Sequence, residues 1–342
     1  MVSRMAEKLT GATMAAINTD LQALEEIKAP IKFLIGRNLT KGQGTGGNPE
    51  LGRFAAEEDR AQIAELLKGT RIVFLAMGAG GGTGTGAGPV IAEIAKNNGA
   101  LVIGFVNLPF YLDGPGKMEI AQKGIEELKK HADTLIQIPN DKIFELLPTD
   151  TRLTDAFEKI DEVFCQGVSG ISDLLTKPGH INLDFADLRS IIKGGGDGIM
   201  GIGIAKGPGR AEEAAGMAAG NPFLQKESLM KSRHVLVSIT CGDNLTVFEV
   251  NRVMKTVESM LPPKAKKFTG VALEPQFQDA LKVMVVATGL ENTPFAETEP
   301  EPVYHKPKRR STGGEKIPDN QPLLFDNEGD LPAYLRKKLG KD

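Results

Sequence analysis

The 342-residue chain contains no tryptophan, and aromatic residues make up only 5% of it. Proteins that bind single-stranded nucleic acid usually stack bases on aromatic side chains, so this scarcity argues against that role. The formal net charge of −3 argues against broad nucleic-acid binding, which needs a basic surface. No apolar run reaches the length of a membrane span, and the first residues do not resemble a signal peptide. We therefore expect no nucleic-acid partner and no direct insertion into a membrane.

Cysteine is also scarce, because the chain contains only Cys165 and Cys241. Both lie in segments with apolar periodicity, so we expect two buried structural thiols in a cytoplasmic protein. The hydrophobic content of 41% and the charged content of 25% are typical of a globular protein. The length is sufficient for two domains.

Short apolar runs alternate with helical periods in the first half of the chain. Buried strands are predicted over 13–17, 31–35, 71–77, 100–106 and 134–138. Asn48 and Pro49 predict the start of a helix that runs to Leu67, and Pro89 predicts the start of another that ends at Gly99. This alternation predicts a parallel sheet that is covered by helices on both faces.

A long helix is predicted over about 151–176, because apolar residues recur there every three or four positions. Beyond it, strands are predicted over 234–240, 268–273 and 282–288, with a helix over 244–261. The predicted fold class is α/β. A parallel-sheet domain over 1–178, which includes the central helix, is joined by that helix to a smaller α+β domain with a small sheet over 179–290.

The composition changes after residue 290 to Pro, Glu, Thr, Lys and Asn. Such a segment cannot bury enough apolar surface to order itself, so we predict a disordered linker over 291–328. Within the final residues, 329–342, an apolar trio is followed by three cations: Leu331, Tyr334, Leu335, Arg336, Lys337 and Lys338. This pattern predicts either a docking peptide or a solvated charged end.

Every residue from Gly78 to Gly88 is glycine, threonine or alanine. The run follows a predicted strand and precedes a predicted helix, where backbone N–H groups can bind an anion. The P-loop pattern GxxxxGK[ST] is excluded because the run contains no lysine. A dinucleotide-binding fingerprint matches only weakly and lacks an acidic residue at the end of the next strand. The remaining alternatives are a structural glycine turn and the phosphate loop GGGTGTG of tubulin/FtsZ proteins.

The chain resembles the tubulin/FtsZ family, and in particular its bacterial cell-division branch, over most of its length. The matching segments occur in family order: INTD (17–20), GRNLTKGQGTGGNPELG (36–52), GGGTGTG (80–86), PND (139–141), NLDFADLR (182–189) and LPAYLRKK (331–338). The resemblance implies that the first domain binds GTP or GDP. It also implies a role in the division ring at mid-cell, and docking of residues 331–338 onto membrane-tethering and regulatory division proteins.

The resemblance also implies the nucleotide contacts. The phosphates are expected to contact Gly80, Gly81, Gly82, Thr83, Gly84, Thr85 and Gly86. Beside the γ-phosphate we expect Gly46, Gly47 and Asn48, and Asn18 and Asp20 are expected at the strand end where ligands of parallel sheets bind. The base and ribose are expected at Asn140 and Asp161. An Asp161 carboxylate can accept from both guanine N1–H and the amino group, and Phe157 is equally suited to stacking on the base and to core packing.

Two features depart from the family pattern. Asp113 and Lys117 stand where the family commonly has Glu and Arg, and a shorter acid with a non-bidentate cation should weaken the ribose and phosphate contacts. The chain also begins inside the helix that follows the family's first strand and first glycine turn. Either the start lies further upstream or the chain is a variant that binds nucleotide weakly. Without that strand, which is internal to the family's sheet, we expect exposed strand edges and fewer phosphate donors.

The segment 182–189 carries the candidate catalytic residues Asn182, Asp184 and Asp187. Two carboxylates at this spacing can share one face of a helical turn and orient a water molecule. A capping residue with solvated acids is the structural alternative. Magnesium is the default cation for triphosphate chemistry, although no residue is assigned as its ligand.

The central helix separates these acids from Asp161 by roughly 25–30 Å, so one chain cannot easily use both on one nucleotide. Head-to-tail stacking would bring them together, and such a heterologous contact forms filaments. We therefore expect a GTPase that is activated by its own assembly. The competing expectations are a non-hydrolysing structural homologue that co-assembles with a full-length partner, and a dinucleotide oxidoreductase.

Overall fold

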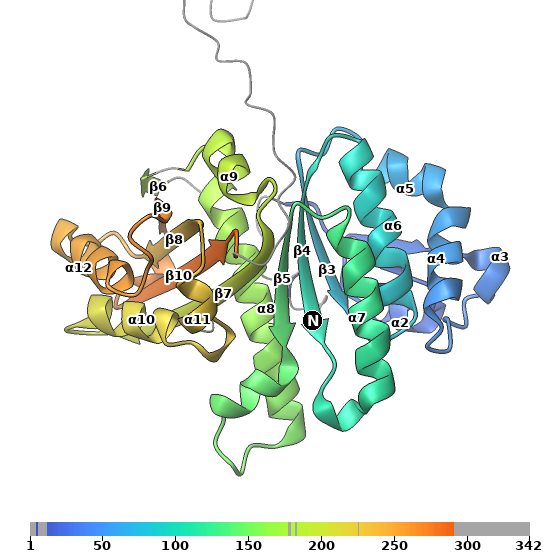
Figure 1. Cartoon of the computed structure of the whole chain (residues 1–342), viewed down its shortest axis with the longest axis horizontal. Helices are drawn as coiled ribbons and strands as arrows, with labels where there is room; N and C mark the ends of the chain where they lie inside the picture. Colours follow the sequence, from blue (N-terminus) through green and yellow to red (C-terminus); the bar gives the residue numbers. More distant parts are fainter. Residues whose placement is uncertain (1–4, 6–11, 177–178, 182, 225, 291–342) are drawn as a thin grey trace, which may run out of the picture. The chain divides into compact units, whose positions relative to one another are not determined.

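The computed structural model describes residues 5, 12–176, 179–181, 183–224 and 226–290 (Figure 1). The chain divides into two compact units, Met1–Glu297 and Thr298–Asp342, and the described residues all belong to the first. The predicted linker (291–328) and docking peptide (329–342) lie outside the described residues. Within the described part of the chain, no helix combines the length and the apolar character that crossing a bilayer requires.

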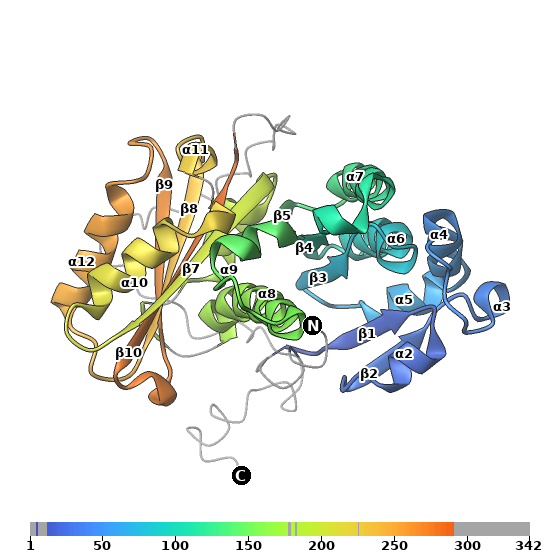
Figure 2. The same ribbon diagram turned by 90° about the horizontal axis from the view of Figure 1, so that it is seen from below.

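An eight-stranded sheet has the order β3-β4-β5-β7-β10-β8-β9-β6. Strands β3 (Ile72–Gly78), β4 (Leu101–Leu108) and β5 (Thr134–Pro139) are parallel, as the sequence predicts. Helices α6 (Thr83–Asn97) and α7 (Pro115–Lys129) cover one face of these strands, and α8 (Leu153–Thr176) covers the other (Figures 1 and 2). The prediction of a parallel sheet covered on both faces is confirmed.

The strands of the second half continue the same sheet. Strand β7 (Gly196–Lys206) pairs in parallel with β5 and antiparallel with β10 (Ala280–Thr288). The remaining strands are β8 (His234–Cys241), β9 (Lys266–Leu273) and β6 (Gly179–Ile181). The predicted strands near 234, 268 and 282 are therefore present, but they join the first sheet and do not form a small one of their own.

Strand β7 is absent from the sequence prediction because its sequence is rich in glycine. Two of these glycines allow helix α10 (Arg210–Ala219) to pack directly on the strand. A Cβ atom on Gly201 would lie 2.1 Å from the carbonyl oxygen of Ala218, and one on Gly203 would lie 2.1 Å from that of Ala214. Gly201 and Gly203 are therefore explained by close packing against α10. Strand propensity describes single residues and does not take such packing into account.

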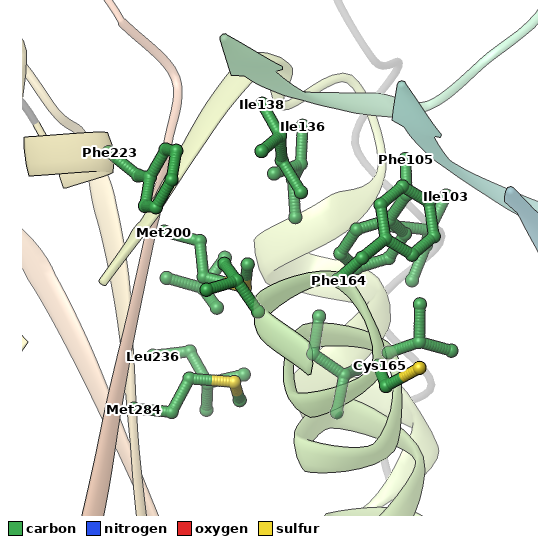
Figure 3. Packing of buried hydrophobic residues seen from close by; sticks show 14 of the residues in the cluster. Ile103, Phe105, Ile136, Ile138, Phe164, Cys165, Met200, Phe223, Leu236 and Met284 are labelled. Carbon is green, nitrogen blue, oxygen red and sulfur yellow. The ribbon is translucent and has the colours of Figure 1, made fainter. Parts of the chain in front are cut away.

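Helix α8 organises the largest hydrophobic cluster (Figure 3). Phe164 on α8 is fully buried, and its ring centroid lies 5.7 Å from that of Phe105 on β4. Met200 from β7 and Met284 from β10 reach the same cluster. The helix thus packs on strands from both halves of the sheet, and this shared core explains why the described residues form one compact unit.

Two predicted helices differ from the structure. The helix expected over 49–67 is divided into α4 (Pro49–Glu58) and α5 (Arg60–Leu66). Asp59 separates them and accepts a hydrogen bond from the backbone N–H of Gly36 at 2.7 Å. The helix expected to start at Pro89 instead starts at Thr83, so Pro89 lies inside α6.

Helix α12 forms where the sequence predicts a helix, and the remaining helices are short. Helix α12 spans Val247–Glu258, and Thr246 forms a capping box with Glu249 at its start. The remaining α-helices are α2 (Leu21–Glu25), α3 (Arg37–Thr40), α9 (Phe185–Ile192) and α11 (Lys226–Leu229). The 3₁₀ turns are η1 (Tyr111–Asp113), η2 (Asn140–Glu145), η3 (Pro222–Leu224) and η4 (Pro275–Phe277).

Strands β1 (Ala15–Asn18) and β2 (Ile31–Leu34) form a separate two-stranded parallel sheet. Among the described residues no strand joins it to β3, which is the edge of the larger sheet. The edge position leaves the apolar run Ile72–Ala76 of β3 only half-buried, whereas Leu101–Val106 of β4 are all buried. Strand β3 is therefore a partly exposed edge strand of the described sheet.

A buried ion pair in the second half of the chain joins helices α10 and α12. Arg210 on α10 is 6% exposed, and its Nε donates to Glu249 Oε1 on α12 at 2.7 Å. Other guanidinium nitrogens donate to Asn244 Oδ1 and to the carbonyl oxygen of Gln278, both at 3.0 Å. The hydrogen bond from Arg210 lowers the pKa of Glu249, although burial opposes the shift. This stabilisation is present above the unfolded-state pKa and is lost as the pH falls through the lower folded-state pKa.

We predict that Glu249→Gln lowers the free energy of unfolding by about 2 kcal/mol at pH 7, because it leaves a buried guanidinium without its anion. Urea unfolding at a series of pH values measures this difference, which should shrink as the pH falls through the lowered folded-state pKa of Glu249 and the wild-type carboxylate becomes protonated. Glu212→Gln is the matched control, since Glu212 pairs with Arg252 at the surface and should cost less than about 0.5 kcal/mol. Equal effects of the two variants would contradict the prediction.

Candidate functional site

The glycine-rich loop joins β3 to α6, and most of its glycines serve helix packing. A Cβ on Gly82 would lie 2.7 Å from the backbone nitrogen of Asn48, and one on Gly86 would lie 1.9 Å from the carbonyl oxygen of Pro49. A Cβ on Gly84 would approach the carbonyl oxygen of Gly78. At Gly81, in contrast, no described atom lies within 4 Å of the Cβ position apart from those of Gly81 and its two chain neighbours. Gly81 is therefore a point where a ligand can approach the loop backbone.

The second glycine-rich loop lies directly against the first. Asn48 caps α4, and its Oδ1 accepts from the backbone N–H groups of Glu50 at 3.0 Å and Leu51 at 3.4 Å. Gly46 and Gly47 precede it with φ angles of 58° and 82°, a conformation that favours glycine. The structure thus brings the predicted residues Gly46–Asn48 and Gly80–Gly86 together at two helix N-termini.

The end of β1 contacts the same loop through a residue that the sequence prediction omits. The hydroxyl oxygens of Thr19 and Thr83 lie 2.7 Å apart, and Thr19 is fully buried. The predicted residues on either side make local bonds. Asn18 Oδ1 accepts from the backbone N–H of Thr19 at 2.8 Å, and Asp20 Oδ1 accepts from that of Ala23 at 3.0 Å. These two side chains therefore shape the turn beside the loop.

Asp113 and Lys117 lie beside Gly80, but they are paired with each other. Lys117 Nζ donates to Asp113 Oδ1 at 2.6 Å, and the backbone N–H of Phe110 donates to Asp113 Oδ2 at 3.0 Å. The bond from Lys117 is the main reason why the pKa of Asp113 is lowered, with the Phe110 N–H adding to it and desolvation opposing both. A Cβ on Gly80 would lie 2.9 Å from the carbonyl oxygen of Lys117, so α7 begins directly against the glycine-rich loop.

An aromatic cluster occupies the α8 side of this strand end. The ring of Phe157 packs edge-on against Phe110, with centroids 5.4 Å apart, and Phe144 lies 5.7 Å from Phe110. Phe157 nevertheless remains 48% exposed, so it combines packing with a free surface on which a base could stack. One turn further along α8 is Asp161, and Asn140 opens η2 after β5.

Two asparagine oxygens are buried without a hydrogen-bond partner in the described part of the chain. Neither Asn140 Oδ1 nor Asn107 Oδ1 has a hydrogen-bond partner among the described residues. The sequence prediction includes Asn140 but omits Asn107. The signal that could have found Asn107 is an amide side chain at the end of the otherwise apolar run 101–108.

The candidate catalytic acids form the start of α9. Asp184 is its N-cap, and Asp184 Oδ1 accepts from the backbone N–H of Asp187 at 2.7 Å. Asp184 is exposed and Asp187 is half-buried, whereas Asn182 lies outside the described residues. Asp184 thus has the capping role that the sequence analysis gives as the structural alternative. The carboxylates of Asp184 and Asp187 remain accessible to solvent.

These acids lie at the opposite end of the sheet from the glycine-rich loops. The guanidinium of Arg71, just before β3, lies 4.2 Å from the ring centroid of Phe185, the first residue of α9. The glycine-rich loop follows the other end of the same strand, which spans roughly 20 Å. Figure 1 shows α9 at the end away from the arrowheads of β4 and β5. The structure therefore does not bring Asp184 and Asp187 to the predicted nucleotide contacts of the same chain.

The described residues do not form a metal site by themselves. No group of three His, Cys, Asp or Glu side chains suited to a metal ion occurs in the described ranges. The donor set therefore does not match a magnesium site made of protein side chains, and we assign no step to a metal.

Comparison with known proteins identifies the family. Residues 4–148 match the "Tubulin/FtsZ family, GTPase domain", and residues 196–291 match the "FtsZ family, C-terminal domain". The "Cell division protein FtsZ" of Buchnera aphidicola subsp. Schizaphis graminum (strain Sg) is 45% identical over 284 residues, which cover 83% of this chain and 74% of that protein. The chain belongs to the tubulin/FtsZ family.

Comparison with solved structures agrees with this assignment. An FtsZ dimer from M. jannaschii, described as empty, superimposes with a TM-score of 0.80 at 41% identity, covering 84% of each chain. CetZ1 from Haloferax volcanii, a GDP-bound monomer, has a TM-score of 0.73 at 21% identity and covers 86% of this chain and 91% of its own. At that identity CetZ1 supports the fold alone. The predicted resemblance is confirmed, and a dinucleotide oxidoreductase is excluded.

The two kinds of glycine in the tubulin/FtsZ loop give a matched test. We predict that Gly86→Ala lowers the free energy of unfolding by about 2 kcal/mol or more, because its methyl group meets the backbone of α4. Gly81→Ala should stay within about 1 kcal/mol of the wild type yet bind GDP at least about tenfold more weakly, because its methyl group occupies the approach to the loop backbone. Chemical denaturation and equilibrium titration with GDP measure the two effects. Unchanged GDP binding by a folded Gly81→Ala protein would show that the phosphates do not approach there.

Proposed function

We propose that this chain binds GTP and GDP and assembles head to tail into filaments of the division ring, where each contact between two copies completes a GTPase site. One observation carries the proposal. The glycine-rich loops and the acids Asp184 and Asp187 lie at opposite ends of one sheet. A nucleotide at one end of a copy can therefore meet acids only from the other end of a second copy.

The residues at the first end suit a guanine nucleotide. The N-terminus of α6 and the backbone at Gly81 offer N–H donors to phosphate oxygens. Asp161 on α8 provides a carboxylate that can accept from both guanine N1–H and the amino group, a pair of donors that adenine lacks. Phe157 offers a half-exposed ring beside it. Together these features favour GTP over ATP.

The residues at the other end suit activation of water. Asp187 of one copy would accept a hydrogen bond from a water molecule that faces the γ-phosphate held by its neighbour. The water oxygen forms a bond to the γ-phosphorus while the bond to the β–γ bridging oxygen breaks, which yields GDP and inorganic phosphate. Asp184 holds the first turn of α9 and thereby positions Asp187.

Exposed apolar side chains support assembly through two different surfaces. Tyr111 and Leu112, beside the nucleotide end, are 90% and 70% exposed. Val247 and Phe248, at the start of α12, are 83% and 76% exposed. Exposed apolar pairs of this size often mark interaction sites, and two unlike surfaces are what a heterologous, filament-forming contact requires. The structure of an FtsZ relative as a dimer agrees with self-association.

The relatives favour this function over a non-hydrolysing structural homologue, since the matching curated proteins carry the name of a cell-division protein. We further propose that the filament acts at mid-cell, and that residues 331–338 bind membrane-tethering and regulatory division proteins. A magnesium ion held mainly by the phosphates and water would accompany the triphosphate.

The proposal predicts that Asp187→Ala binds GTP and sediments as filaments, yet releases phosphate at least about a hundredfold more slowly than the wild type. In the wild type the rate of phosphate release per molecule should rise cooperatively above a threshold protein concentration. Equilibrium titration with GTP, sedimentation and a phosphate-release assay measure binding, assembly and hydrolysis respectively. A full rate in dilute, unassembled protein would refute hydrolysis at the contact.

Mixing two variants tests whether the site is shared between copies. Asp161→Ala impairs the nucleotide end and Asp187→Ala impairs the acid end, so neither should hydrolyse GTP well alone. In random mixed filaments about one contact in four pairs two intact ends, and the rate should recover to about a quarter of the wild-type value. Filaments that contain both variants but show no recovered rate would contradict a shared site.

A further inference from the structure

The second half of helix α9 is held firmly by the sheet. Thr134 Oγ1 donates to the carbonyl oxygen of Ile192 at 2.7 Å, and Thr288 Oγ1 donates to that of Ile191 at 2.8 Å. Both threonines and both isoleucines are fully buried. Hydrogen bonds and packing therefore fix the end of α9 that lies away from the candidate acids.

The first turn of α9, which carries Asp184 and Asp187, is more open. Asp184 is exposed, whereas Phe185 and Asp187 are half-buried. The hydrogen bond from the N–H of Asp187 to Asp184 Oδ1 lies within the turn, so it does not attach the turn to another element. Phe185 supplies such an attachment, because the guanidinium carbon of Arg71 lies 4.2 Å from its ring centroid.

The chemistry of this contact suits a restraint at the surface. A guanidinium is planar and is attracted to the face of an aromatic ring, so it can cover the ring and still meet water at its edge. Arg71 is exposed and immediately precedes β3. Its carbonyl oxygen accepts from the backbone N–H of Leu101 at 2.9 Å, which fixes its backbone to the start of β4. Arg71 therefore connects the sheet to the first turn of α9.

The contact lies between the two acids in the chain. Phe185 directly follows the cap Asp184 and comes two residues before Asp187. A restraint on Phe185 thus limits the movement of the backbone that directs the Asp187 carboxylate. Because displacing a catalytic group by about 1 Å can slow a reaction about a hundredfold, a contact that adds little to stability can still affect the rate.

We propose that Arg71 is a positioning residue for GTP hydrolysis. By stacking on Phe185, it keeps the first turn of α9 where Asp187 meets the nucleotide of the next copy. The inference rests on the proposed function, since it assumes that Asp187 activates the attacking water. It adds to that function a residue of the sheet that lies far from the glycine-rich loops of its own copy.

The test measures phosphate release per molecule at saturating GTP, at protein concentrations where sedimentation shows that nearly all of the protein is in filaments. Arg71→Ala should turn over about threefold to tenfold more slowly than the wild type, with GTP affinity within about twofold. Arg71→Lys keeps a cation that can lie over the ring, so it should lose less than about twofold.

Lys266→Ala is the matched control. Lys266 Nζ lies 5.1 Å from the ring centroid of Phe268 on β9, so this variant removes a contact between a cation and a ring from another part of the sheet. Its turnover should equal that of the wild type. Equal losses in Arg71→Ala and Arg71→Lys, or wild-type turnover of Arg71→Ala in filaments, would overturn the proposal. These outcomes can be read because Arg71 is exposed, so its replacement should not prevent folding.

A double-variant comparison tests whether Arg71 acts through the ring. Phe185→Leu removes the ring but keeps an apolar side chain. The variant with both changes should then turn over no more slowly than Phe185→Leu alone. Losses that multiply would show that Arg71 acts independently of Phe185 and would overturn the proposal, as would a weaker GTP affinity that accounts for the slower rate. An unchanged rate of phosphate release by Asp187→Ala would instead overturn the proposed function.

Discussion

The backbone contact between the two glycine-rich loops is the constraint on which the candidate site of this protein depends. Gly82 and Gly86 at the start of α6 meet the backbone of Asn48 and Pro49 at the start of α4 at distances that no side chain could occupy. Two helix N-termini therefore converge beside the end of β3, and the buried hydroxyl pair of Thr19 and Thr83 joins the end of β1 to them. The run of small residues is required first for this packing, and the packing leaves the backbone open at Gly81.

The continuous sheet separates two sets of candidate residues and so gives the molecule two different ends. Because β3 carries the glycine-rich loop at one end and Arg71 contacts α9 at the other, the acids of α9 cannot reach the glycine-rich loop of the same chain. The shared core around α8 holds both halves in one unit. Under the proposed function, two complementary halves of a site at opposite ends of the molecule would favour assembly in a line.

Much of the fold could be predicted from the amino-acid sequence. The buried strands, the central helix and the tubulin/FtsZ family follow from apolar periodicity and from motifs such as GGGTGTG, because these patterns are local. The predicted start of α6 is wrong. Proline is common at the first helical position, so the sequence favours Pro89. In the structure the helix begins six residues earlier, among glycines that pack against α4. Strand β7 is absent from the prediction because its glycines reflect contact with α10, which no local pattern reports. Asn107 is absent for a similar reason, since burial without a partner is a property of the folded chain.

The amino-acid sequence alone determined the family, the alternation of strands and helices and the identity of the candidate acids, because each depends on residues close together in the chain. Only the tertiary structure decided that the second half extends the first sheet, that Asp113 is paired with Lys117, and that the acids and the glycine-rich loops lie at opposite ends of β3. These properties depend on strand pairing and side-chain contacts between distant segments. Many pairings satisfy the same local pattern, and the burial of a common core selects one of them.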